Sequence, residues 1–92
     1  VAEGFPGDFL AAGLAARARL SMNGDEHDAA FAAWDRGDHE AALEELQQAF
    51  AAAQDTAERD LIRQAMVGIF TELGADHPLA REHRRRLSLA LY

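Results

Sequence analysis

The fold is decided by the stretch from residue 37 to residue 50, which reads GDHEAALEELQQAF. Glycine followed by aspartate ends one helix and begins another, because glycine fits the left-handed position after a helix and aspartate caps the next. The apolar positions then recur at helical spacing, at Ala42, Leu43, Leu46, Ala49 and Phe50. The stretch therefore predicts a turn between two helices, the second of which has one apolar face.

The same signals divide the rest of the chain. The predicted helices begin at Asp8, Asp25, Asp38, Asp55 and Pro78. The first is expected to end at about Met22, and glycines at 24, 37 and 74 follow the first, second and fourth helices. Asp55 with Glu58 three residues later indicates a capping box. Gly68 lies inside the fourth helix, where we expect it to allow close packing of a neighbouring helix.

No segment alternates between apolar and polar residues with the period of a strand. The sequence therefore predicts an all-α fold of about five helices. Because the connections are short, successive helices are expected to form antiparallel hairpins.

The composition excludes several classes of protein. The chain has 92 residues, which corresponds to one small domain, and it contains no cysteine for disulfides, thiolate metal sites or thiol redox chemistry. Its formal net charge of −7 opposes binding to nucleic acid, whose affinity depends on basic side chains that neutralise phosphates. No apolar run approaches the roughly 18 residues of a membrane span.

Charge is unevenly distributed along the sequence. Residues 1–76 hold 15 acidic and five arginine side chains, a net charge of −10, whereas residues 77–92 hold four arginines and one glutamate, a net charge of +3. On a helical wheel Arg81, Arg84 and Arg85 point to solvent, while Arg86 lies at the flank and is expected to pair with Glu82. The three outward arginines are a hypothetical partner-binding surface, and a simply solvated helix end is the alternative.

No residue pattern indicates catalysis. The four histidines, at 27, 39, 77 and 83, form no metal-ligand spacing, and His83 falls on an apolar face where a packing role is expected. Ser21 and Ser88 have no nucleophile motif around them, and no glycine-rich phosphate loop is present. We therefore predict no enzyme activity, no catalytic residue, no cofactor site and no metal site.

The aromatic residues are expected to serve packing more than ligand binding. Those at 31, 34, 50 and 70 recur at helical spacing, which is typical of a core. The segment from Val1 to Phe9, with Phe5, is either a packed arm or an exposed linker. Because the chain begins with valine, we expect it to be a piece of a longer protein.

The region from 26 to 53 resembles a tetratricopeptide repeat. In that motif the turn between the helices reads Gly-Asp-aromatic-Glu-x-Ala, and here Gly37, Asp38 and Glu40 match it while His39 replaces the aromatic. Ala30, Ala42 and Ala49 would be the small residues that let the two helices cross closely. The resemblance implies a right-handed helical array that presents surfaces to peptides or partner helices.

Roughly residues 25–92 resemble the C-terminal part of the thioredoxin-like co-chaperone (holdase) family. The resemblance is most specific over residues 66–92, which read MVGIFTELGADHPLAREHRRRLSLALY. That family ends in Phe-Glu-Leu-Leu-Gly, an acidic residue and proline, an Arg-Glu-Tyr-Arg-Arg-Arg-Leu run and a terminal aromatic. His83 stands where the family has tyrosine. The family's thioredoxin domain lies outside this chain, so its redox or chaperone residues have no counterpart here.

Together these patterns predict an N-terminal helix or linker over residues 1–24 and a tetratricopeptide-like domain over residues 25–92. The predicted function is a non-catalytic protein–protein interaction module of a cytoplasmic co-chaperone that binds client proteins or chaperones. A homo-oligomerisation domain and a regulatory appendage of an enzyme are the alternatives. The expected partners are other proteins, including a second copy in a homodimer, and neither nucleic acid nor membrane.

Overall fold

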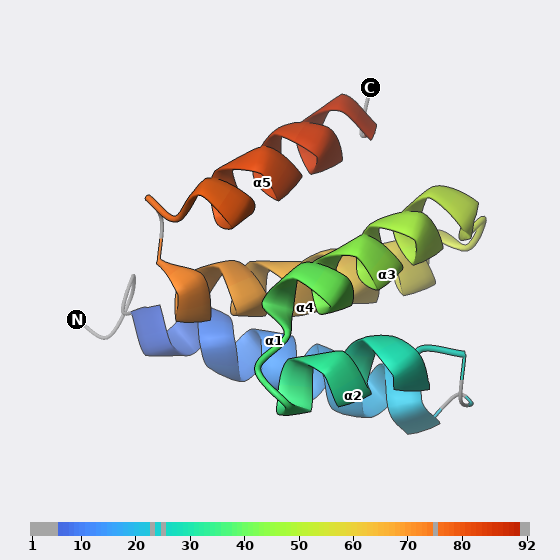
Figure 1. Ribbon diagram of the computed structural model, residues 1–92. Helices are drawn as coiled ribbons and strands as arrows, with labels where there is room; N and C mark the ends of the chain where they lie inside the picture. The colour runs from blue at the N-terminus through green and yellow to red at the C-terminus, as the bar shows by residue number, and fades with distance from the viewer. Residues whose placement is uncertain (1–5, 23, 25, 75, 91–92) are drawn as a thin grey trace.

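The computed structural model describes residues 6–22, 24, 26–74 and 76–90 (Figure 1). Over those residues it contains five helices and no strand, so the all-α prediction is confirmed. The helices are α1 (Pro6–Met22), α2 (Asp28–Asp35), α3 (His39–Ala52), α4 (Thr56–Leu73) and α5 (Pro78–Ala90). Within the described residues no helix combines the length and apolarity that crossing a membrane requires.

Two of the predicted aspartate caps are confirmed. The Ala41 amide donates to Asp38 Oδ1 over 3.2 Å, and the Ala57 amide donates to Asp55 Oδ1 over 3.4 Å. Gly37 and Gly74 follow α2 and α4 with φ of 83° and 97°, a conformation that glycine adopts without steric cost. Local signals therefore define the turn of the α2–α3 hairpin and the start of α4.

The first two helices begin elsewhere than predicted. α1 starts at Pro6 and not after Asp8, which agrees with the fixed φ of proline at the first helical position. α2 starts at Asp28, with His27 at its N-cap position, and the predicted cap Asp25 lies outside the described residues. The predicted arm is also largely outside them, since residues 1–5 and the side chain of Phe9 are not described.

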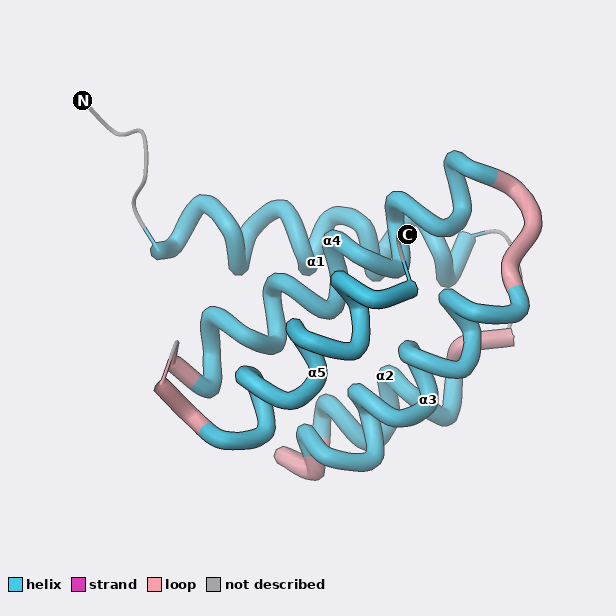
Figure 2. Tube along the Cα trace, turned by 90° about the horizontal axis from the view of Figure 1, so that it is seen from above, coloured by secondary structure: helices cyan, strands magenta, loops and turns pink. Residues whose placement is uncertain are grey.

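The helices are arranged in layers. In Figure 1, α1 and α2 lie below α4 and α3, and α5 lies above both; Figure 2 shows the same arrangement from above. α2 and α3 form an antiparallel hairpin, as the turn at residue 37 predicts. α4 packs most extensively against α1, which runs antiparallel to it, and less against its successor α5.

The contact between α1 and α4 depends on two glycines. A Cβ atom added to Gly13 would lie 2.8 Å from the Gly68 Cα and 3.0 Å from the Gln64 carbonyl oxygen. A Cβ added to Gly68 would lie 3.0 Å from the Gly13 Cα. Because these neighbours are backbone atoms, the two helices touch main chain to main chain. The expected packing role of Gly68 is confirmed, and its partner is Gly13.

One apolar core joins all five helices. The predicted aromatic core residues are buried in it, and Leu20 carries α1 into the same cluster. The fully buried large side chains are Leu43, Leu46, Phe50, Ile62, Met66, Ile69 and His83. The Trp34 indole N–H is satisfied at the edge of the core, where it donates to Glu72 Oε1 over 2.7 Å. This core fixes the positions of α2, α3 and α4, which surround the groove described next.

Candidate functional site

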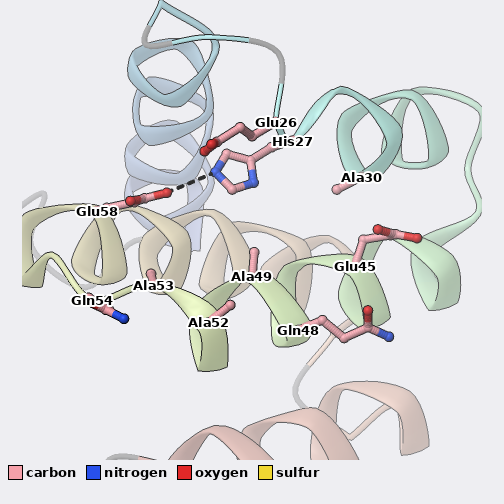
Figure 3. A pocket seen from close by; sticks show the side chains of 10 residues that line it. All are labelled: Glu26, His27, Ala30, Glu45, Gln48, Ala49, Ala52, Ala53, Gln54 and Glu58. Carbon is pink, nitrogen blue, oxygen red and sulfur yellow. Dashed lines mark ion pairs between the residues drawn. The ribbon is translucent and has the colours of Figure 1, made fainter.

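A groove lies where α2, the C-terminal half of α3 and the start of α4 meet (Figure 3). Its volume is about 580 Å³. The lining residues are Glu26, His27, Ala30, Glu45, Gln48, Ala49, Ala52, Ala53, Gln54 and Glu58. This set is referred to below as the acidic groove.

One face of α3 provides four of the ten residues that line the acidic groove. Glu45, Gln48, Ala49 and Ala52 are spaced three or four residues apart and therefore lie on the same side of the helix. The alanines have no side chain beyond Cβ, so the middle of the face is low while the glutamate and glutamine side chains rise around it (Figure 3). The result is a hollow with a small apolar floor and a polar rim.

The lining of the acidic groove is rich in carboxylates. Three carboxylates line it, those of Glu26, Glu45 and Glu58, and no lysine or arginine is among the ten lining residues. The groove is open to solvent, and the charges on its rim attract cationic groups over about one Debye length.

His27 and Glu58 join α2 to α4 at one end of the acidic groove. His27 Nε2 lies 3.4 Å from Glu58 Oε2, and the His27 side chain is only 10% exposed. The edge of the Phe31 ring system meets the imidazole at a centroid distance of 6.2 Å and an interplanar angle of 61°. The Glu58 carboxylate, expected to complete a capping box with Asp55, is therefore turned toward α2.

The predicted partner-binding arginines lie elsewhere. Arg81, Arg84 and Arg85 are exposed on α5, and none of them lines the acidic groove. Arg85 forms an exposed ion pair with Glu82 over 3.3 Å. Whether these arginines bind a partner therefore stays a prediction.

Arg86 differs from its neighbours and from its predicted pairing. Its Nη1 donates to Glu44 Oε2 on α3 over 2.7 Å, whereas Glu82 pairs with Arg85. The expected Glu82–Arg86 pair is therefore wrong, because the flank position places Arg86 within reach of the neighbouring helix. The Arg86 guanidinium holds the pKa of the Glu44 carboxyl below its usual range.

His83 lies beside this pair and is buried, with 1% of its surface exposed. Its Nε2 is 3.7 Å from Glu44 Oε2, and its Nδ1 has no hydrogen-bond partner. Burial lowers the pKa of His83, and the Arg86 charge lowers it further, against the smaller opposing effect of nearby glutamates. The predicted packing role of His83 is confirmed, and the side chain is more completely buried than its position on an amphipathic helix predicted.

Sequence reasoning missed the acidic groove. Glu45 lies on α3, whereas Glu26 precedes α2 and Glu58 lies on α4, so nothing in the local sequence joins them. The signal that could have revealed the groove is the pair of small residues, Ala49 and Ala52, between polar neighbours on an otherwise solvated helix face. Small residues at such positions lower the surface and leave a hollow.

Comparison with known proteins identifies one family. A protein-family model described as tetratricopeptide repeat matches residues 11–92. The comparisons with curated proteins and with solved structures give no match. The match covers most of the chain, including α1 from residue 11 onward, and it agrees with the helix–turn–helix hairpin and with the helical array of the structure. On these grounds the chain belongs to the tetratricopeptide repeat family, whose repeats generally mediate protein–protein interaction.

Proposed function

We propose that this protein binds a segment of a partner protein in the acidic groove. The observation that carries the proposal is the groove itself, a hollow of about 580 Å³ with an alanine floor and a carboxylate rim on a fold that is a protein-interaction scaffold. A shallow floor accommodates side chains of an extended or helical peptide, and the rim selects for charge. The preferred segment carries lysine or arginine.

The test is selection of peptides from a phage-displayed random library on the purified chain. Ala52 and Ala51 provide a matched pair, since both are exposed in the last turn of α3 and only Ala52 lines the groove. Wild type and Ala51→Arg should enrich the same basic peptides. Ala52→Arg should lose them, because its side chain fills the groove and its positive charge repels a basic peptide. Enrichment that is equal in all three proteins, or peptides without basic residues, would contradict the proposal.

A second candidate surface is the exposed arginine face of α5, formed by Arg81, Arg84 and Arg85. What favours it is the exposure of these three side chains on a basic helix, whose net charge is opposite to that of the rest of the chain. Charge reversal of all three should leave the free energy of unfolding nearly unchanged and weaken binding to an acidic partner. Binding that survives the reversal would assign the face to solvation alone.

The finer proposal is that the chain forms the C-terminal helical part of a thioredoxin-like co-chaperone of the cytoplasm, with residues 1–24 as an N-terminal helix or linker segment and residues 25–92 as the tetratricopeptide-like interaction domain. The similarity of residues 66–92 to the end of that family supports it. The coding sequence upstream of Val1 is the direct test. A thioredoxin-like domain there would support the proposal, and a different catalytic domain would favour a regulatory appendage.

Self-association is the alternative use of the same scaffold. Light scattering of the chain at increasing concentration distinguishes the two. A homodimer would support the oligomerisation alternative, and a strict monomer at high concentration would argue against it.

A further inference from the structure

We infer that Glu26, His27 and Glu58 form a binding site for a single Zn²⁺ ion. One ligand atom of each residue lies within 4.8 Å of those of the other two. An imidazole nitrogen with two carboxylate oxygens is a donor set that zinc accepts in proteins, with a fourth position left to water. The spacing of histidines along the sequence had predicted no metal site, because Glu58 comes from a different helix.

The distance between the two inner ligands fits the ion. Zinc binds nitrogen and oxygen at about 2.0–2.2 Å, so two ligand atoms at the corners of a tetrahedron lie roughly 3.3–3.6 Å apart. His27 Nε2 and Glu58 Oε2 are 3.4 Å apart, which is longer than an ordinary N–H···O hydrogen bond. The pair is thus already at the spacing of two zinc ligands.

The third ligand needs only a side-chain rotation. Figure 3 shows the Glu26 carboxylate beside the His27 ring, on the side that faces Glu58. Glu26 is exposed, so its side chain can turn without disturbing the core. His27 by contrast is held in place, because its ring is largely buried and meets Phe31 edge to face. A fixed imidazole with two adjustable carboxylates can close around an ion without movement of the helices.

The site is also accessible. The three residues line the acidic groove and at the same time a second hollow of about 210 Å³, where Leu20, Asp55 and Leu61 are among their neighbours. Solvent reaches the cluster from both sides, which provides a path for the ion and room for a water ligand. The negative charge of the groove favours the approach of a divalent cation.

Zinc bound here would connect the N-terminal end of α2 to the first turns of α4. Because the ligand set exists only in the folded chain, binding would stabilise the fold in proportion to the logarithm of the zinc concentration above the dissociation constant. The site requires no partner protein, so zinc binding is measured on the chain alone. Because the ion would neutralise Glu26 and Glu58, two of the three carboxylates of the acidic groove, bound zinc should weaken the binding of a basic segment there.

The test is titration of the tag-free, EDTA-treated chain with Zn²⁺ in an isothermal calorimeter, with unfolding temperature as a second readout. We expect one equivalent of zinc to bind and to raise the unfolding temperature. His27→Ala should weaken the affinity at least about tenfold, the lower end of the effect of losing even an outer-sphere partner. Glu58→Gln, which keeps the shape of the side chain, should weaken it as well.

His77→Ala is the matched control, since His77 is exposed at the start of α5 and does not line the groove. It should bind zinc as the wild type does. Affinity that is equal in wild type and His27→Ala, or the absence of zinc binding at micromolar concentration, would overturn the inference. Ca²⁺ at the same concentration should not displace zinc, because imidazole is a poor ligand for a hard cation.

Discussion

The contact of α1 with α4 and the contact of α5 with α3 hold the two ends of the chain in different ways. At the first, Gly13 and Gly68 bring two backbones together with no side chain between them. At the second, Arg86 and His83 reach Glu44 from α5 with long polar side chains, and part of that contact is open to solvent. The N-terminal helix α1 is therefore held by close steric fit, and the C-terminal helix α5 is held partly by electrostatic interactions.

The difference predicts how each end responds to change. A backbone contact has no conformational freedom with which to absorb an added atom, so small steric changes should have large effects. A partly exposed ion pair contributes little to stability, but the protonation of a buried imidazole beside it makes the contact sensitive to pH. Steric substitutions should therefore break the α1–α4 contact, and protonation should break the α3–α5 contact.

The largest expected effect is that of Gly13→Val. Its Cβ would meet the backbone at Gly68 and Gln64 at 3.0 Å or less, so α1 must move away from α4. We expect a loss of at least about 3 kcal/mol in the free energy of unfolding, at the upper end of overpacking effects. Urea denaturation followed by circular dichroism measures it.

Ala11→Val is the control for this substitution. Ala11 is exposed on the same helix, so the same side chain there should cost no more than a difference in helix propensity, about 0.6 kcal/mol. If the two variants unfold at the same urea concentration, α1 does not pack on α4 through these glycines.

The next effect is that of Ala42→Leu, which tests whether close contact through small residues extends to the α2–α3 hairpin. Ala42 is fully buried, so a larger side chain should destabilise by about 1–3 kcal/mol through overpacking. Ala51→Leu, on the exposed side of the same helix, should leave the melting temperature nearly unchanged. A thermal melt of Ala42→Leu without a shift would mean that the two helices do not cross at this residue.

Much of the fold could be predicted from the sequence because its signals are local. Asp38, Asp55, Gly37 and Gly74 define helix ends through interactions within a few residues, and the structure has them there. The start of α1 was predicted two residues late because an aspartate cap and a proline at the first helical position compete within one turn. Gly68 indicated a close approach, but no local pattern named Gly13 as the partner.

The candidate site was harder to predict from the sequence because it is assembled from separate segments. Glu26 and Glu58 are 32 positions apart in the sequence, and only the tertiary fold brings them together. The pairing of Arg86 with Glu44 was missed for the same reason, since helical spacing offered the local partner Glu82. Charge and small-residue patterns show which faces are polar, but not which faces meet.

The third prediction concerns pH at the α3–α5 contact. Because burial lowers the pKa of His83 in the folded chain, the unfolded chain binds the proton more readily, and stability should fall as the pH drops below about 6.5. One such group contributes at most about 1.4 kcal/mol per pH unit. His83→Gln should reduce this slope between pH 7.5 and 5, and an equal slope in both proteins would place the sensitivity elsewhere.

The smallest change in stability is expected for Arg86→Ala. This substitution is informative because it should change the pKa of His83. The Arg86–Glu44 pair is partly exposed, so its loss at neutral pH should shift the urea midpoint only slightly. Removing the guanidinium, however, leaves His83 beside Glu44 without the opposing positive charge, so the pKa of His83 should rise. Titration of the His83 ring protons by NMR measures this shift in the folded protein.

Gly13→Ala should leave the same pKa unchanged if it still folds, because the glycine contact lies on the other face of α4. A His83 pKa that does not respond to Arg86→Ala would mean that the Arg86 charge does not act on His83, and the electrostatic side of the contrast between the two ends of the chain would then be wrong.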